Sequence, residues 1–105
     1  MTDKKIILST AGSREEAQKI ARSLVERKLA ACVNIVGPIE SVYRWQGAVE
    51  TSEEFLLVIK TTAAAYERVR DLIRLLHSYE LPECIQLSIE DGLPKYLEWI
   101  GKSVE

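Results

Sequence analysis

The sequence predicts an α+β protein with a single domain, residues 1–105, in which helices cover one face of an antiparallel sheet. The apolar patterns follow the order βαββαβ plus one more helix. The two middle β segments follow each other directly and form a hairpin between two right-handed βαβ units. With 105 residues, the chain is long enough for one core and too short for two. We therefore expect a ferredoxin-like sandwich with strand order 4-1-3-2.

The first βαβ unit begins with the apolar strand "KIILST" over residues 5–10. A helix over 13–28 follows, because small and apolar residues recur there at helical spacing. Ser13 and Glu16 are spaced as a capping box, in which hydroxyl and carboxylate each accept a free backbone N–H. The strand "AACVNIV" over 30–36 ends or bends at Gly37-Pro38.

A long hairpin connects the two units. Residues 39–50 continue in extended form, the polar "TSE" at 51–53 is turn-like, and 54–61 return as a strand. Alternation places Ile39, Tyr43 and Trp45 on one face of the first arm. The hairpin is longer than a small sheet can cover, so its edges are free to pair with another chain.

The second unit continues with an amphipathic helix over 63–76 and an extended segment, "HSYELPE". The alternating strand "CIQLSIE" over 84–90 follows, and Pro94 begins a third helix. Since these helices cover one sheet face only, the other face is left open. That open face includes Leu56, Val58 and Val42. A self-assembly with closed cyclic symmetry would cover it.

Charge and composition restrict the partners. The net charge is −2 with both signs mixed, which argues against nucleic acid as the main partner. Neither a membrane-spanning apolar run nor a signal peptide is recognisable, so we expect a cytoplasmic protein. Cys32 and Cys84 fall on strands at opposite edges of the sheet, roughly 14 Å apart. We therefore expect two free thiols.

Five segments occur together in a characteristic order: "KLAACVNIV", "SVYRWQG", "LLVIKTT", "HSYELPE" and "YLEWI". Through them the chain resembles the CutA family of divalent-cation tolerance proteins over nearly its full length. The resemblance implies a ferredoxin-like protomer, a tight homotrimer and a role in copper tolerance. It also implies an assembly similar to that of the PII signal proteins.

The resemblance also implies a crevice near subunit contacts. Its matching positions here are His77, Tyr79, Glu83, Cys32, Trp45, Lys60 and Trp99. In the family, copper binding is linked to a first-strand thiol and to a His-His pair. Ser9 and Leu76 stand at these positions in this chain. We therefore expect weak binding of copper or another divalent cation, with His77, Glu83 and Cys32 as candidate ligands.

Each candidate residue also has a structural alternative. His77, the only histidine, could cap the second helix instead of binding a ligand. Lys60 could form a buried ion pair with Glu83 or with a carboxylate of another chain. Trp45 and Trp99 are expected to anchor an interface. The phenol of Tyr79 could serve a ligand or a buried carbonyl equally well.

No HExxH, GxSxG or phosphate-binding GxxxxGK[ST] motif occurs in the sequence. Three hypotheses about function therefore remain open. They are a metal-handling trimer, a sensor trimer for a small ligand similar to the PII proteins, and an enzyme with a crevice at the subunit interface.

Overall fold

A computed structural model describes residues 2–105 and contains a four-stranded antiparallel sheet in the order β2-β3-β1-β4. This is the predicted ferredoxin-like order. The strands are β1 (Lys4–Ala11), β2 (Cys32–Trp45), β3 (Ala48–Thr62) and β4 (Ile85–Ser88). The helices are α1 (Arg14–Glu26), α2 (Tyr66–Leu76) after a short 3-10 turn, and α3 (Pro94–Ser103), which has its proline in the first turn as predicted.

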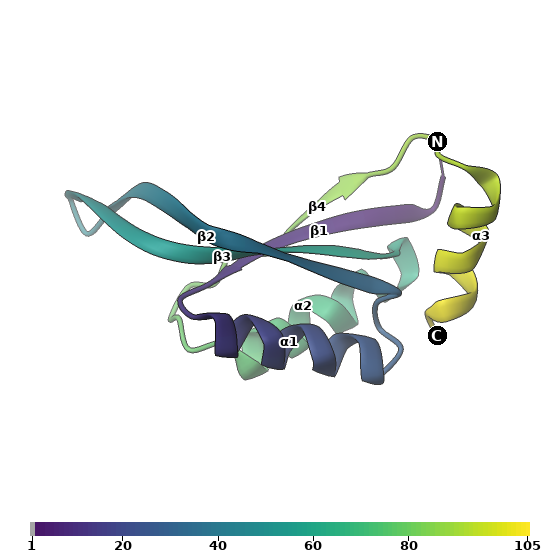
Figure 1. Ribbon diagram of the computed structural model, residues 1–105, viewed down its shortest axis with the longest axis horizontal. Helices are drawn as coiled ribbons and strands as arrows, with labels where there is room; N and C mark the ends of the chain where they lie inside the picture. The colour runs from purple at the N-terminus through teal and green to yellow at the C-terminus, as the bar shows by residue number, and fades with distance from the viewer. Residues whose placement is uncertain (1) are drawn as a thin grey trace.

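Helices α1 and α2 lie side by side across one face of the sheet (Figure 1). The core forms between them and the strands, where alternate side chains of β1 and β3 point to this face. Its fully buried larger members include Ile7, Leu57 and Ile59 of the sheet, Ile20 and Leu24 of α1, and Val69 and Ile73 of α2. Helix α3 packs at the end of the sheet near both termini, where Ile100 is buried.

The β2–β3 hairpin projects beyond the helices and gives the molecule an elongated shape (Figure 1). Its radius of gyration is 14.2 Å, against about 13 Å for a compact domain of this size. The turn is at Gln46 and Gly47, which both have positive φ, as a two-residue hairpin turn requires. The prediction of a turn at 51–53 was therefore wrong. Those residues are paired within the ladder, and their polarity reflects exposure of the projecting arm.

Strand β2 changes register between Val36 and Ile39. Gly37 lies in this irregularity, and a Cβ there would come within 2.6 Å of Phe55 Cδ2. Beyond it, Ile39, Tyr43 and Trp45 share one face of the hairpin, as predicted, opposite Glu54, Glu50 and Ala48. Val42 pairs with Thr51 and so lies on the other side of the ribbon from Leu56. Its predicted place on the open face was wrong because the irregularity shifts the alternation.

None of the helices within residues 2–105 covers the second face of the sheet (Figure 1). On this open face, Leu56 and Val58 are half-buried, and Val36, Ile85 and Leu87 are 46%, 50% and 48% exposed. Register places these side chains on one face, because Leu8 pairs with both Val58 and Ile85. The prediction of an uncovered apolar face is confirmed for Leu56 and Val58. No helix within residues 2–105 has the length and apolarity to cross a membrane.

Both thiols are free, as predicted. Cys32 begins β2 at one edge of the sheet, and Cys84 precedes β4 at the other. Cys84 packs against the core, and burial raises the pKa of its thiol. A raised pKa keeps the thiol protonated and unreactive at neutral pH.

Candidate functional site

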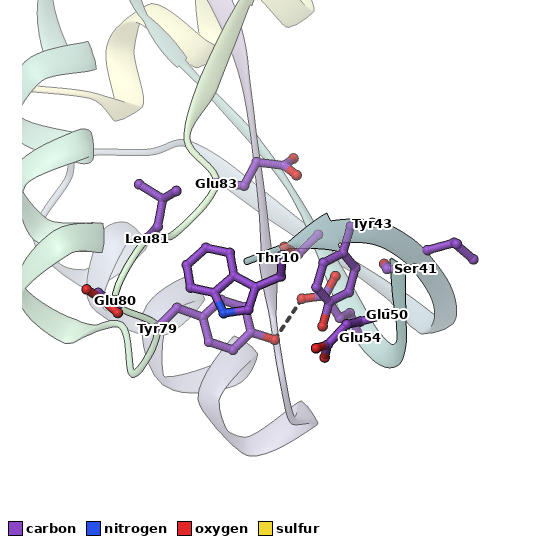
Figure 2. Close-up of a pocket in the computed structure, with 11 residues that line it drawn as sticks. Thr10, Ser41, Tyr43, Glu50, Glu54, Tyr79, Glu80, Leu81 and Glu83 are labelled. Atoms are coloured by element: carbon purple, nitrogen blue, oxygen red, sulfur yellow. Dashed lines mark hydrogen bonds between the residues drawn. The ribbon is translucent and has the colours of Figure 1, made fainter. Parts of the chain in front are cut away.

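A pocket of about 700 Å³ lies beside the base of the hairpin, between the strands and the segment that leads from α2 to β4 (Figure 2). The hairpin contributes Tyr43, Trp45, Glu50 and Glu54, and the connecting segment contributes Tyr79, Glu80, Leu81 and Glu83. Four lining residues are glutamates, three are aromatic, and none of those within the described chain is Lys, Arg or His. This composition favours a cationic occupant.

His77 fixes the connecting segment to β1. Its Nε2 lies 2.6 Å from the Thr10 carbonyl oxygen, and its Nδ1 lies 3.1 Å from the backbone nitrogen of Tyr79. These partners assign a neutral ring that donates from Nε2–H to the carbonyl and accepts at Nδ1. His77 also ends α2, as predicted, by donating its backbone N–H to Ile73. Its ring, however, bonds β1 rather than the last carbonyls of the helix.

Glu16 holds the same segment from the side of α1. Ser13 Oγ accepts from the Glu16 backbone N–H at 3.1 Å, so half of the predicted capping box is present. The Glu16 carboxylate instead accepts the backbone N–H of Ser78 at 2.7 Å. Burial alone would raise the Glu16 pKa, but the hydrogen bonds from Ser78 hold it below its usual value. The carboxylate thus acts as a charged link between α1 and the pocket wall.

Tyr79 joins the connecting segment to the hairpin. Its hydroxyl donates to Glu54 Oε2 at 2.7 Å, shown as the dashed line in Figure 2. Burial, and then this bond to a carboxylate, raise the pKa of Tyr79, so the phenol stays protonated. Gly12 gives the ring its space, since a Cβ there would lie 3.1 Å from the Tyr79 hydroxyl. The phenol therefore bonds a carboxylate. The sequence analysis considered a ligand or a buried carbonyl as its partner.

Within the described part of the chain, the carboxylates of the pocket form no ion pairs with basic side chains. Glu54 is only 8% exposed. Within residues 2–105, no ion pair involves Glu50, Glu54, Glu80 or Glu83. Burial, with a smaller contribution from the negative charge of Glu54, raises the pKa of Glu83. The buried Glu54 carboxylate and the exposed Glu83 carboxylate line one cavity, and a positive charge between them would stabilise both.

Lys60 and Cys32 lie elsewhere on the sheet. They are cross-strand partners on β3 and β2, with Lys60 Nζ 3.9 Å from Cys32 Sγ. Lys60 donates to Asn34 Oδ1. Within the chain, the predicted ion pair between Lys60 and Glu83 is therefore not formed, because Glu83 belongs to the pocket near the other edge of the sheet.

The three candidate metal ligands are not brought together in one chain. Glu83 faces the pocket, Cys32 lies at the β2 edge, and both ring nitrogens of His77 are engaged by backbone groups. Among the described residues, no three His, Cys, Asp or Glu side chains are grouped so as to hold a metal ion. Within one chain, Cys32 is thus separated from Glu83, and His77 is bonded to backbone groups. A site formed at a subunit boundary stays a prediction.

Of the seven positions that the resemblance assigns to a crevice, Trp45, Tyr79 and Glu83 line the pocket, whereas Lys60 does not. Trp99 lies on α3, 44% exposed, with its ring 5.4 Å from that of Tyr96. Tyr43, Glu50 and Glu54 were not predicted from the sequence as pocket residues, although all three line the pocket. Tyr43 pairs directly with Glu50. A turn placed at Gln46-Gly47 would have predicted this cross-strand pair, which the misplaced turn concealed.

Comparison with known proteins gives one family. The family model described as CutA1 divalent ion tolerance protein matches residues 5–103. A divalent-cation tolerance protein CutA of Thermus thermophilus is 44% identical over 93% of this chain and 95% of its own length. A second, of Archaeoglobus fulgidus, is 46% identical over 94% of this chain and 96% of its own.

Solved structures agree with this assignment. A divalent cation tolerance protein from Thermus thermophilus superposes with a TM-score of 0.95 at 42% identity, covering 97% of this chain and 99% of that one. A CutA from Xylella fastidiosa gives a TM-score of 0.96 at 40% identity, covering 99% of this chain and 100% of its own. With the fold, the motifs and these matches in agreement, the chain belongs to the CutA family of divalent-cation tolerance proteins.

Proposed function

We propose that the chain acts in divalent-cation tolerance as a cytoplasmic homotrimer whose pockets bind cations weakly. One observation carries the binding role: four glutamates line a single pocket whose described lining includes no basic residue. Carboxylate oxygens are ligands for hard divalent ions and accept copper less well than imidazole or thiolate does. The site therefore takes copper or another divalent cation with low affinity.

The homotrimer is supported by the open apolar face and by the projecting hairpin. A face that carries Ile85 and Leu87 half exposed gains free energy when covered. The hairpin offers unpaired backbone groups along its outer edge. A closed ring of identical chains meets both needs at once. The two free thiols support the proposed cytoplasmic location, because thiols stay reduced in the cytoplasm. Fractionation of cells that express the tagged chain tests the location.

Glu54 and Glu83 are the proposed ion-binding groups, and His77 is not among them. The His77 ring is occupied at both nitrogens and holds the pocket wall. Cys32 lies beside Lys60, whose positive charge opposes the approach of a metal ion. The absence of a three-ligand group within the described chain accounts for the weak affinity.

Calorimetric titration with Cu(II) and Mn(II) at pH 7 tests the proposal. We expect weak binding by the wild type and by His77→Ala, and loss of binding by the double variant Glu54→Gln, Glu83→Gln. Glu53→Gln, on the exposed side of the same strand, is the matched control and should bind like the wild type. A nanomolar site with one copper per chain, lost in His77→Ala, would contradict the assignment. Absence of binding in every variant would reject the metal role.

The size of the pocket favours a second candidate function, a sensor for a small ligand. A volume of about 700 Å³ far exceeds the space needed by one ion and falls in the usual range for organic ligands. Thermal shifts caused by a ligand, without turnover, would support this function over an enzymatic one.

A further inference from the structure

The pocket combines two features that recognise the same kind of ligand. Tyr43 and Trp45 line it from the hairpin, and Tyr79 lines it from the connecting segment, so aromatic rings are contributed by two separate parts of the chain. Figure 2 shows the hydroxyl of Tyr79 bonded to the carboxylate of Glu54, and Tyr43 lines the same pocket from its position opposite Glu50. Aromatic faces attract cations electrostatically, and groups of such rings bind alkylated ammonium ions. A bare metal ion makes no use of them.

Glu54 provides the second, independent observation. The side chain is more than nine-tenths buried, yet a neutral phenol is the one hydrogen-bond donor that the described chain gives its carboxylate. A buried carboxylate is costly unless it is paired with a positive charge. No ion pair within residues 2–105 supplies that charge. The group is therefore placed to receive a cation through the pocket opening.

We propose that the pocket binds an organic ammonium ion, with its charged head against Glu54 and its alkyl groups against Tyr43, Trp45 and Tyr79. The inference rests on the cation-binding role proposed above and specifies the class of ligand. The lining provides charge and aromatic surface without a grouped ligand set for a metal. An ammonium head needs only those two features, because it forms no coordination bonds.

A titration with choline, followed by the indole N–H signals of the two tryptophans in NMR spectra, tests the proposal on the whole protein. The uncharged analogue 3,3-dimethylbutan-1-ol has the same shape and is the ligand control. We expect choline to shift the Trp45 signal saturably and to leave Trp99, outside the pocket, unchanged. The alcohol should shift neither. Equal shifts with both compounds would overturn the proposal, since the pocket would then be recognising shape and not charge.

Variants locate the binding group. Glu54→Gln keeps the shape and removes the charge, and it should weaken choline binding at least about tenfold. Glu53→Gln, with the same change of net charge on the exposed side of β3, should bind choline as the wild type does. Tyr43→Leu is the second pocket variant if Glu54→Gln does not fold, and it too should bind more weakly. Unchanged affinity in the folded pocket variants would overturn the assignment.

A basic side chain from a second copy of the chain is the competing occupant. In that case the wild type would not bind choline, and the proposal would be wrong. The two proposals fail separately. Choline binding without Mn(II) or Cu(II) binding would reject the metal role and keep this inference. Metal binding without choline binding would do the reverse.

Discussion

The two faces of the sheet carry similar apolar side chains but have different surroundings. On the helix-covered face, Ile7, Leu57 and Ile59 are completely buried by α1 and α2. On the open face, Ile85 and Leu87, at alternate positions of β4, remain about half exposed. Both faces belong to the same four strands. The difference in exposure between the two faces therefore arises because helices cover only one of them. One face is covered within the chain, and the other is left half exposed.

The largest expected effect is on the covered face. Leu57→Ala removes a fully buried side chain and should lower the free energy of unfolding by about 2–5 kcal/mol. Val49→Ala, on the exposed arm of the same strand, is the control and should change it by about 0.5 kcal/mol or less. Urea unfolding at one fixed chain concentration measures both. A loss of similar size at the two positions would remove the distinction between core and arm.

On the open face, Leu87→Glu should separate the chains while leaving each one folded. The substitution removes apolar burial of about 1.5–3 kcal/mol per copy and introduces a charge into the contact. The fold should persist because Leu87 is not part of the core in a single chain. Light scattering gives the mass, and circular dichroism reports the fold. An unchanged mass would mean that this face is not the contact between copies.

The hydrogen bonds of the buried His77 ring test how much a polar contact adds to stability, in comparison with the apolar core. His77→Ala leaves the Thr10 carbonyl and the Tyr79 N–H without partners and should cost about 1–3 kcal/mol. Leu75→Ala is its control, since Leu75 lies on the same helix with its side chain 74% exposed. Chemical unfolding of both variants compares them. If His77→Ala left the free energy of unfolding unchanged, the ring would not be what holds the connecting segment against β1.

The smallest effects concern two carboxylates with opposite pKa shifts. The lowered Glu16 pKa gives a stabilisation that is present above the ordinary value of 4.5 and lost as pH falls through the folded value. Glu16→Gln should therefore cost about 1 kcal/mol at pH 7 and little in acid. The raised Glu83 pKa favours folding at low pH, and this contribution is lost as pH rises through the folded value.

Accordingly, Glu83→Gln should be neutral in acid and should stabilise the protein at pH 7 by about 0.5 kcal/mol or less. Urea unfolding across this pH range follows both variants. Parallel pH profiles for Glu16→Gln and Glu83→Gln would show that their environments do not differ in the way described.

Sequence reasoning predicted most of the fold because the fold depends on local patterns. Helical spacing and strand alternation identified every main element, and Pro94 marked the start of α3. The hairpin turn was misplaced because "TSE" is polar, although Gln46-Gly47 better suits positive φ. Residues 51–53 are polar because the projecting arm is exposed to solvent, and the chain does not change direction at them.

The site was harder to predict because it depends on contacts between distant segments. Tyr79 and Glu54 are 25 residues apart and meet only when the connecting segment crosses to β4. Glu16 was expected to complete a local cap but serves Ser78, which is 62 residues away. The motif positions Cys32 and Lys60 carried the family resemblance, which did not show that the two residues pair with each other across β2 and β3. Such pairings depend on exact register and on how the connecting segment crosses the sheet, which the predicted strand order does not specify.

The mass of the wild-type protein in dilute solution tests most directly whether further copies cover the open face. Light scattering after size-exclusion chromatography at micromolar chain concentration measures it without a label. We expect three times the chain mass of 11.9 kDa. A mass equal to one chain would contradict the account, because Ile85, Leu87 and the rest of the open face would then be left permanently in contact with water.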